Sequence, residues 1–235
     1  MIKGIEEHRT ILSLDGTTVP VDPFVSGATI NVSIKLPGGE LALIRIENRQ
    51  QGAMLADACA GLIRPKGGVV QFLGKDWSVL PPDIANALRG RIGRVFSKGG
   101  WMSHLTLLEN ILLSQLHHTR RPVEDLRDEA CRLAQHYNLP GVPIGRPNEV
   151  VQIDLRRAAC VRAFIGWPSL IVLEDPTSGG FSEMIPKLMN TIRDSLNRGA
   201  AVIWLTVENT IWRDQSIPAT YRYRFAGGKL MEVSP

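Results

Sequence analysis

Hydrophobic and polar positions divide the chain into three stretches with different periods. In the first stretch, up to residue 98, short runs of alternating or continuous apolar residues are separated by glycine, proline and aspartate. This pattern is typical of strands, and those expected are 9–14, 28–36, 41–46, 67–74 and 92–96. Helical spacing of apolar residues predicts two helices in the same stretch, at 50–63 and 83–90.

The middle stretch, between Trp101 and Phe164, has no strong strand pattern. Apolar residues recur there at helical spacing in three segments, at 105–116, 123–137 and 156–165. Thr106, with Glu109 three residues later, predicts a capping box. The last stretch returns to strands at 169–176 and 200–207, with a helix at 183–199 between them and a closing hairpin at 221–233. The order indicates an α/β core that carries a helical insertion.

Composition narrows the class of protein. The chain has 235 residues, of which 44% are hydrophobic and 21% charged, which is ordinary for a folded globular protein and argues against disorder. No run approaches the roughly 18 apolar residues of a membrane-spanning helix, and the first ten residues lack the apolar region of a secretory signal. The net charge, 27 − 23 = +4, is too small and too scattered to predict nucleic-acid binding.

The spacing of cysteine and histidine along the sequence predicts no metal site. The three cysteines have no metal-binding or redox spacing, and a sparse, odd number suits a reducing compartment. The histidines considered as ligands fit no metal spacing either; they are His104, His117, His118 and His136. No metal-binding cluster is therefore expected.

Four segments, in their order along the chain, resemble the nucleotide-binding domain of ABC transporters. They are 39–68, 91–110, 156–164 and 169–180, and the resemblance extends over about residues 10–233. It implies a P-loop NTPase-like ABC ATPase fold: a mixed sheet core with a β-rich N-terminal subdomain and a helical insertion subdomain. The expected organisation is one unit over 1–235, with the core at 1–98 and 166–235 and the helical subdomain at 99–165. The form RRAACVRAF, with the pair Gly99-Gly100, is most similar to the Mla/Mce lipid-transport branch.

The P-loop of that family, GxxxxGK[ST], aligns without gaps to residues 46–53. Its glycine amides and lysine bind phosphates, and its hydroxyl binds Mg²⁺. The four required positions hold residues without that chemistry: Ile46 and Gln51 for the glycines, Gly52 for the lysine and Ala53 for the hydroxyl. The lysine, the hydroxyl for Mg²⁺ and one backbone contact are missing. Since a hydrogen bond to a charged group contributes about 1.5–3 kcal/mol, their absence removes about 4–9 kcal/mol of ATP-binding free energy. Micromolar binding amounts to only about 8 kcal/mol.

ATP and Mg²⁺, the cofactors that the resemblance implies, are therefore expected to bind weakly or not at all. Glu47 adds a negative charge where phosphates would lie. Arg49 is the residue of this segment that could still contact a phosphate, and an exposed loop arginine is the alternative interpretation.

The Walker B strand of the family ends in Asp-Glu-Pro, with the aspartate for Mg²⁺ and the glutamate for the attacking water. This chain has Glu174-Asp175-Pro176, so the two candidate catalytic carboxylates are exchanged. A general base must lie within about 2.6–3.2 Å of its proton, and a misplacement of about 1 Å can cost about 100-fold in rate. The exchange alone is expected to cripple activity; the alternative is that these carboxylates only cap the end of a strand.

The remaining motif positions also lack the residues that the family uses to bind and hydrolyse ATP. The signature LSGGQ corresponds to 150–154, which has no glycine and ends in Asp154. The Q-loop glutamine corresponds to Ser97, the switch histidine to Val207 and the D-loop aspartate to Phe181. No aromatic residue for stacking on adenine occurs in 14–21, and Phe24 is more consistent with core packing.

A permease partner is implied by the same resemblance. The family receives the permease's coupling helix in a groove, and the corresponding residues here are Ser97, Gly99, Gly100, Trp101 and Met102. An exposed aromatic residue beside a methionine suits such a groove, with core packing as the alternative for Trp101. The resemblance also implies a dimer with itself or with a paralogous ABC ATPase, and a location in the cytoplasm, peripheral on the inner face of the cell membrane.

These observations favour a non-catalytic ABC-type subunit that serves as a structural or regulatory partner of a membrane permease. Two alternatives stay open. One is an active but divergent ABC ATPase that uses Arg49 and the Glu174-Asp175 pair. The other is a soluble interaction module unconnected to transport.

Overall fold

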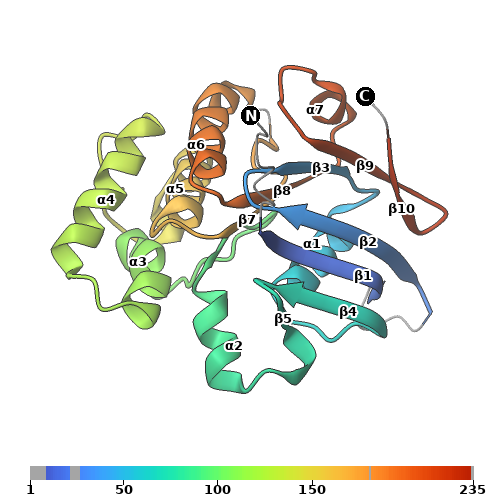
Figure 1. Cartoon of the computed structure of the whole chain (residues 1–235). Helices are drawn as coiled ribbons and strands as arrows, with labels where there is room; N and C mark the ends of the chain where they lie inside the picture. The colour runs from blue at the N-terminus through green and yellow to red at the C-terminus, as the bar shows by residue number, and fades with distance from the viewer. Residues whose placement is uncertain (1–8, 22–26, 180, 234–235) are drawn as a thin grey trace, which may run out of the picture.

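One curled, mixed sheet organises the protein (Figure 1). The computed structural model describes residues 9–21, 27–179 and 181–233. Within them the sheet has ten strands in the order β5-β4-β1-β2-β10-β9-β3-β8-β7-β6. Their bounds are β1 Thr10–Pro20, β2 Thr29–Pro37, β3 Leu41–Arg45, β4 Gly67–Phe72, β5 Lys75–Asp76, β6 Ile92–Val95, β7 Leu170–Glu174, β8 Ala201–Thr206, β9 Tyr221–Ala226 and β10 Lys229–Glu232.

The parallel half of the sheet comprises β9, β3, β8, β7 and β6. Strands β3, β7 and β8 are covered on both faces, which explains why their sequences are apolar without alternation. Successive side chains of β7 enter different clusters: Ile171 and Leu173 face the helices α3 to α6, whereas Leu170 and Val172 face α1. Two hydrophobic cores, one on each side of the same strands, therefore hold this half in place.

The antiparallel half is built on β1, which pairs with both β2 and β4. β1 is bent where its register shifts between Leu14 and Thr17, and a bulge of this kind increases local twist. The bend curls the sheet around α1 (Arg49–Cys59), which contacts β1 and β4 as well as β7 and β8. Helix α1 is thereby enclosed, and its first turn is fixed at the end of β3.

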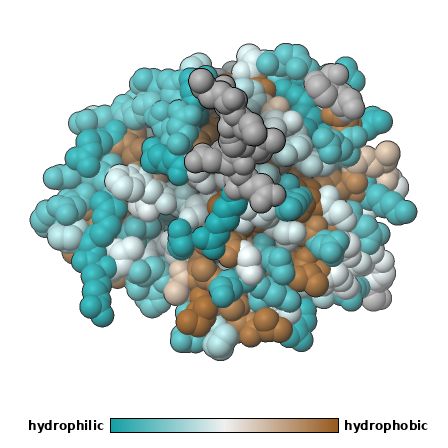
Figure 2. Space-filling view, in the orientation of Figure 1, coloured by the Kyte–Doolittle hydropathy of each residue, from teal (hydrophilic) through white to brown (hydrophobic). Residues whose placement is uncertain are grey.

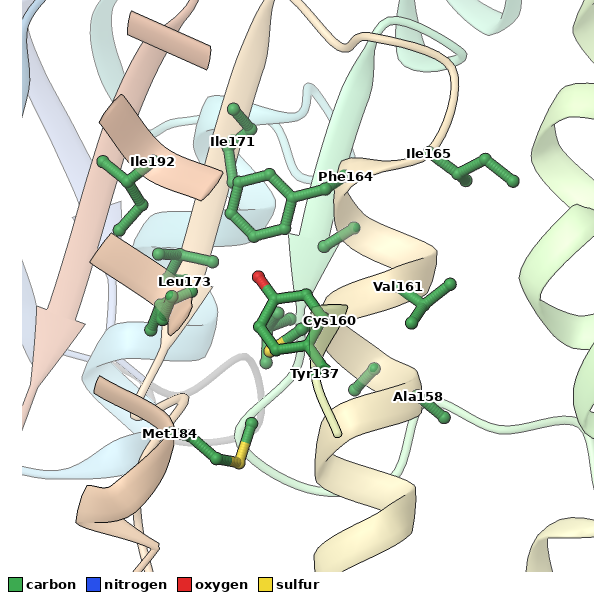
Figure 3. Packing of buried hydrophobic residues seen from close by; sticks show 14 of the residues in the cluster. Tyr137, Ala158, Cys160, Val161, Phe164, Ile165, Ile171, Leu173, Met184 and Ile192 are labelled. Carbon is green, nitrogen blue, oxygen red and sulfur yellow. The ribbon is translucent and has the colours of Figure 1, made fainter. Parts of the chain in front are cut away.

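The helices between β6 and β7 gather on one side of the parallel strands (Figure 1). They are α3 Leu107–His118, α4 Val123–His136 and α5 Gln152–Phe164, with the 3-10 turn η2 Pro147–Glu149. Figure 3 shows Tyr137 and Phe164 between α5 and β7, and the Tyr137 hydroxyl donates a hydrogen bond to Thr191 Oγ1 at 3.0 Å. This bond satisfies a buried phenol and ties the helical insertion to α6.

The other helical elements are α2 Pro82–Arg89, α6 Ile185–Asn197, α7 Asn209–Arg213 and the 3-10 turns η1 Trp77–Val79 and η3 Ser182–Met184. In the described ranges, no helix is both long and apolar enough to cross a membrane.

Most expected elements are present. The strands, the closing hairpin, the Thr106–Glu109 capping box and the helices of the insertion are confirmed. The sequence analysis did not predict β5, α7 or the first turn of α5, which begins at Gln152. The division into a core (1–98 and 166–235) and a helical subdomain (99–165) stays a prediction.

Candidate functional site

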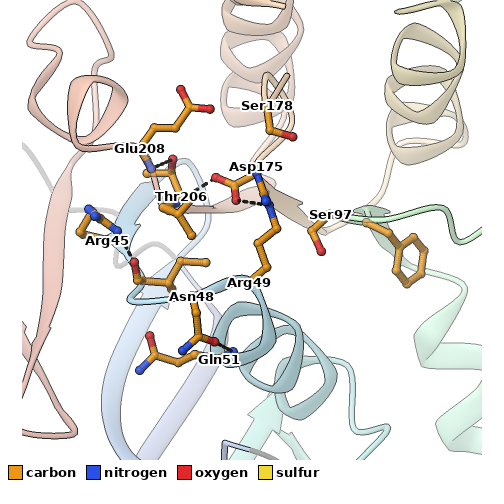
Figure 4. A network of polar contacts seen from close by, with 12 residues as sticks. Arg45, Asn48, Arg49, Gln51, Ser97, Asp175, Ser178, Thr206 and Glu208 are labelled. Carbon is orange, nitrogen blue, oxygen red and sulfur yellow. Dashed lines mark hydrogen bonds and ion pairs between the residues drawn. The ribbon is translucent and has the colours of Figure 1, made fainter. Parts of the chain in front are cut away.

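The carboxyl ends of β3, β7 and β8 meet at one edge of the sheet, as neighbouring parallel strands require. This edge carries the turn 46–48 after β3, the pair Glu174-Asp175 after β7, and Thr206 and Val207 after β8. Figure 4 shows Asn48, Arg49 and Gln51 below Asp175 and Thr206. The structure thus brings the P-loop positions and the exchanged carboxylates together, as the sequence comparison placed them.

The turn after β3 closes on its own side chains. Helix α1 begins at Arg49, and Asn48 is its N-cap, whose Oδ1 accepts a hydrogen bond from the Gln51 amide at 2.9 Å. The Gln51 side chain reaches back, and its Oε1 accepts from the Glu47 amide at 2.8 Å. Backbone amides at a helix N-terminus are the usual anion-binding groups, and two of them are already satisfied inside this turn.

Ile46 and Gly52 fit each other. Ile46 is buried, and a Cβ placed on Gly52 would lie 2.5 Å from Ile46 Cδ1. Carbon atoms that are not bonded pack at about 3.5–4.0 Å, so a side chain at residue 52 requires Ile46 to move. The space that a P-loop lysine stem would need is filled by the isoleucine that replaces the first glycine.

Asp175 is buried and held by two groups. Its Oδ1 accepts a hydrogen bond from the Val207 amide at 2.9 Å, and its Oδ2 forms an ion pair with Arg49 Nε at 3.3 Å. Its backbone has φ of +43°, a strained conformation for a residue with a Cβ. Arg49 lies in a helix and not in a loop, because it is the first residue of α1. Its side chain points toward Asp175, at the Walker B position (Figure 4).

Glu174 is paired with an arginine that the sequence analysis did not connect to the site. Glu174 Oε1 lies 2.6 Å from Arg94 Nε, and Arg94 Nη1 lies 2.5 Å from Asp57 Oδ1. Burial lowers the pKa of Arg94, but the charge of Glu174 and hydrogen bonds to both carboxylates raise it above the ordinary value. The available signal was a charged residue inside the apolar strand IGRVF, because a buried charge requires a partner.

The other motif positions lie around this edge. The Ser97 carbonyl accepts a hydrogen bond from Arg156 Nη2 at 2.8 Å, and Asp154 pairs with Arg157 at 3.0 Å. Val207 contributes its backbone amide to Asp175, and Phe181 lines a cleft beside Arg49. Phe24 lies outside the described residues.

Trp101 is half-buried against a cation. The Arg162 guanidinium lies 4.0 Å from the Trp101 ring centroid and donates a hydrogen bond to the Gly100 carbonyl. Met102 is 47% exposed, and its backbone is fixed by the Asn110 amide. Burial and the nearby charge of Arg94 lower the pKa of Arg162 to about 10. Of the five residues named for a partner groove, Met102 thus presents an exposed apolar side chain, whereas Trp101 packs on Arg162.

Glu174 and Asp175 are the carboxylates at this edge that could contact a metal ion. In the portion of the chain that the structure describes, no group of three or more His, Cys, Asp or Glu side chains could hold a metal ion. Both carboxylates have arginine partners, and Ala53 has no hydroxyl to offer.

Comparison with solved structures shows that the chain has the fold of the ATP-binding cassette of ABC transporters. The dimeric structure of MJ0796, a bacterial ABC transporter cassette, superposes with a TM-score of 0.78 over 96% of this chain and 100% of that one, at 19% identity. Its ADP- and phosphate-bound dimeric form gives 0.77 at 20% identity. The expected ABC ATPase fold is confirmed. No protein-family model matches the chain.

Proteins with similar sequences are also named as ATP-binding proteins of transport systems. The chain is 25% identical over 215 residues to the octopine permease ATP-binding protein P of Rhizobium radiobacter, covering 87% of this chain and 80% of the relative. It is 27% identical over 153 residues to the glutamate/aspartate import ATP-binding protein GltL of Escherichia coli K12, covering 65% and 62%. At these identities, the chain is similar to ATP-binding proteins of permease and import systems.

Proposed function

We propose that the protein is a non-catalytic ABC transporter subunit of the ATP-binding type, a structural or regulatory partner of a membrane permease. The observation that carries this proposal is the internal pairing at the strand edge. Arg94 and Arg49 neutralise Glu174 and Asp175, and Asn48 and Gln51 occupy amides that would otherwise face phosphates.

The residues present do not fit Mg²⁺–ATP. For Glu174 to bind a metal ion, Arg94 must leave it, and breaking a buried ion pair costs about 3–5 kcal/mol. For a lysine to reach the phosphates from residue 52, Ile46 must move. Neither change is offset by a hydroxyl at residue 53 or by a histidine at residue 207, because those positions hold alanine and valine.

A permease partner is proposed from the relatives, which are named as ATP-binding proteins of permease or import systems. On this proposal the chain lies in the cytoplasm, peripheral on the inner face of the membrane, and pairs with itself or with a paralogous ABC ATPase. The lipid-transport branch is the proposed context, supported by the form RRAACVRAF and the pair Gly99-Gly100.

The permease contact is proposed at a groove of about 300 Å³ between α2, α3 and β6. Its apolar lining includes Leu62, which is 55% exposed, and Phe96. Exposed apolar residues continue from it over α2 and β4, and Figure 2 shows apolar surface gathered at the lower edge of the molecule, where these elements lie. The contact is thus next to residues 97–102, with Leu62 as a better probe than Trp101.

The test has two readouts. The purified chain should hydrolyse ATP no faster than a buffer blank, and it should co-purify with its membrane subunit equally well with and without Mg²⁺–ATP. Leu62→Glu should abolish co-purification, whereas Met231→Glu, on β10 and 50% exposed, should not.

Turnover of about one per second that is lost in Asp175→Ala would favour the active, divergent ATPase instead. Failure to find any membrane subunit, with no hydrolysis, would favour an interaction module unconnected to transport.

A further inference from the structure

A cleft lies at the amino ends of β7 and β8, away from the carboxyl edge of the same strands. It opens between α4, the turn that joins α5 to β7, and the last turns of α6, on the side of the sheet where these helices gather (Figure 1). Its volume is about 360 Å³, and small-molecule sites typically measure about 300–1,000 Å³. The cleft shares no residue with the carboxyl edge or with the groove proposed for the permease.

Trp167, in the turn before β7, is the unusual residue of this cleft. Its backbone has φ of +56°, in the left-handed region that favours glycine and asparagine. The residue is also 71% exposed, although a tryptophan has more apolar surface to bury than almost any other side chain. A strained backbone that is offset by so little burial indicates a functional contact rather than a packing role.

The backbone next to Trp167 is held by a buried ion pair. The Gly166 amide donates a hydrogen bond to Glu129 Oε1 at 2.9 Å, and Glu129 Oε2 lies 2.7 Å from Arg121 Nη2. Glu129 is buried, so this pair fixes the turn while its two charges cancel. The strained conformation of Trp167 is therefore maintained by the surrounding structure.

The charges of the cleft leave a small positive excess. Arg132 on α4 and Arg198 on α6 are exposed in its lining, and Asp194 on α6 is the acidic residue that lies with them. Among the described residues, none of these three side chains forms an ion pair. Over the whole lining, three arginines against two carboxylates leave one positive charge. The cleft is thus suited to a ligand with a single negative charge.

We infer that the cleft beside Trp167 is a binding site for a small aromatic carboxylate. The exposed indole of Trp167, with Phe164 and Leu133 in the lining, offers an apolar surface on which an aromatic ring can stack. The guanidinium groups of Arg132 and Arg198 can bind a carboxylate through paired hydrogen bonds. One excess positive charge matches one carboxylate better than a multiply charged phosphoryl group. The inference goes beyond the proposed function and does not depend on it.

Calorimetric titration of the full chain with 2-naphthoate, at fixed ionic strength, tests the site. We expect saturable binding. The neutral 2-naphthamide, which keeps the ring, and acetate, which keeps the carboxylate, should each bind at least about tenfold more weakly.

Variants of the charged lining test where the carboxylate lies. Arg132→Gln combined with Arg198→Gln should weaken 2-naphthoate binding by at least about tenfold, and Asp194→Asn should tighten it, because a like charge is removed. Arg127→Gln on α4 and Arg193→Gln on α6 are matched controls at exposed arginines outside the cleft, and both should bind as the unaltered chain does.

Trp167→Asn separates a binding role from a structural one. Asparagine tolerates the left-handed backbone, and removal of an exposed ring loses little burial, so the variant should unfold about 2–4 °C higher. Its affinity for 2-naphthoate should nevertheless fall by at least about tenfold. Trp167→Phe keeps an aromatic ring on the same backbone, so it should retain most of the affinity and unfold as the unaltered chain does.

Several outcomes would overturn the inference. They are absence of saturable 2-naphthoate binding, binding of 2-naphthamide as tight as that of 2-naphthoate, and equal losses in the lining variants and the control arginine variants. Weaker binding in Asp194→Asn would show that this carboxylate holds the ligand, which contradicts an anionic ligand. A lower unfolding temperature in Trp167→Asn would show that Trp167 serves the fold.

Failure of this site is distinct from failure of the proposed function. Leu62→Glu, which should abolish co-purification with the membrane subunit, lies outside the cleft and should leave 2-naphthoate binding unchanged. The paired substitution of Arg132 and Arg198 should in turn leave co-purification unchanged.

Discussion

The interior of the parallel strands and their carboxyl edge follow different rules. Inside, β3, β7 and β8 are filled by apolar side chains that alternate between two hydrophobic clusters. At the edge, the same strands end in charged and polar groups that lie almost as deeply, such as Glu174 and Asp175, each 2% exposed. The interior needs only shape and hydrophobicity, whereas the edge requires a partner for every buried charge.

The comparison shows how arginine partners can keep two carboxylates buried at such an edge. Arg94 comes from β6 and Arg49 from α1, so each counter-charge belongs to an element that the fold already places there. The turn after β3 is closed by Asn48 and Gln51 in the same manner. The edge is thus part of the structural core, and its residues should behave in mutagenesis as stabilising residues.

The largest effect is expected for Arg94→Ala. The substitution leaves Glu174 buried without its counter-charge, and removal of one partner of a buried pair costs about 3–5 kcal/mol. Urea unfolding of the variant and the unaltered chain measures the difference. Adding Glu174→Gln should restore part of the loss, because the uncompensated charge is then gone. The control is Arg193→Ala, at an exposed arginine of α6, and an Arg94→Ala variant as stable as this control would contradict the structural role.

The next effect concerns the contact between Ile46 and Gly52. Gly52→Ala should destabilise by about 1–3 kcal/mol through overpacking, although alanine in an open helical position stabilises by about 1 kcal/mol relative to glycine. Gly141 lies in a bend outside the helices, and an added Cβ there meets nothing within 4 Å, so Gly141→Ala controls for an added methyl group without overpacking.

In an Ile46→Val background the cost of Gly52→Ala should shrink, since valine lacks the Cδ1 atom that the new methyl would meet. An equal cost in both backgrounds would show that the contact is not responsible. Because Ile46 fills the space beside residue 52, Gly52→Lys with Ala53→Ser should not create ATP hydrolysis. Robust turnover by that variant would contradict the proposal that this edge is non-catalytic.

A smaller effect is expected at the cap of α1. Asn48→Ala removes the acceptor for the Gln51 amide and should cost about 1 kcal/mol, as N-cap substitutions do. Asn48→Asp keeps an acceptor and should retain most of the stability. Thermal unfolding compares the two, and equal losses would indicate that the side-chain oxygen is not what stabilises the turn.

The smallest expected effect is the thiol reactivity of the two buried cysteines, which measures how often the hydrophobic cores open locally. Burial raises the pKa of Cys59 and of Cys160 to about 12, whereas Cys131 is exposed on α4. Since the thiolate is the reactive form, a disulfide reagent at about pH 8 should label Cys131 alone in the folded chain. Rapid labelling of Cys59 or Cys160 would show that the core beneath the edge opens readily.

The sequence was informative about the scaffold because most strands and helices follow from local periodicity and caps, as at Thr106 and Glu109. The structure brings residues 46–53 and the pair Glu174-Asp175 together, because the ends of parallel strands converge at one edge of the sheet. The sequence could not reveal that Arg94 pairs with Glu174 across 80 residues, or that Gln51 turns back on Glu47. Those contacts depend on side-chain direction and burial, which a linear pattern does not contain.

Equilibrium binding of ATP to the purified chain, measured with saturating Mg²⁺ and again with EDTA, tests the central claim most directly. With both carboxylates held by arginines, Mg²⁺ should leave the affinity unchanged, and no ADP should form. Tightening by about tenfold or more with Mg²⁺, lost in Asp175→Ala and accompanied by hydrolysis, would contradict the account.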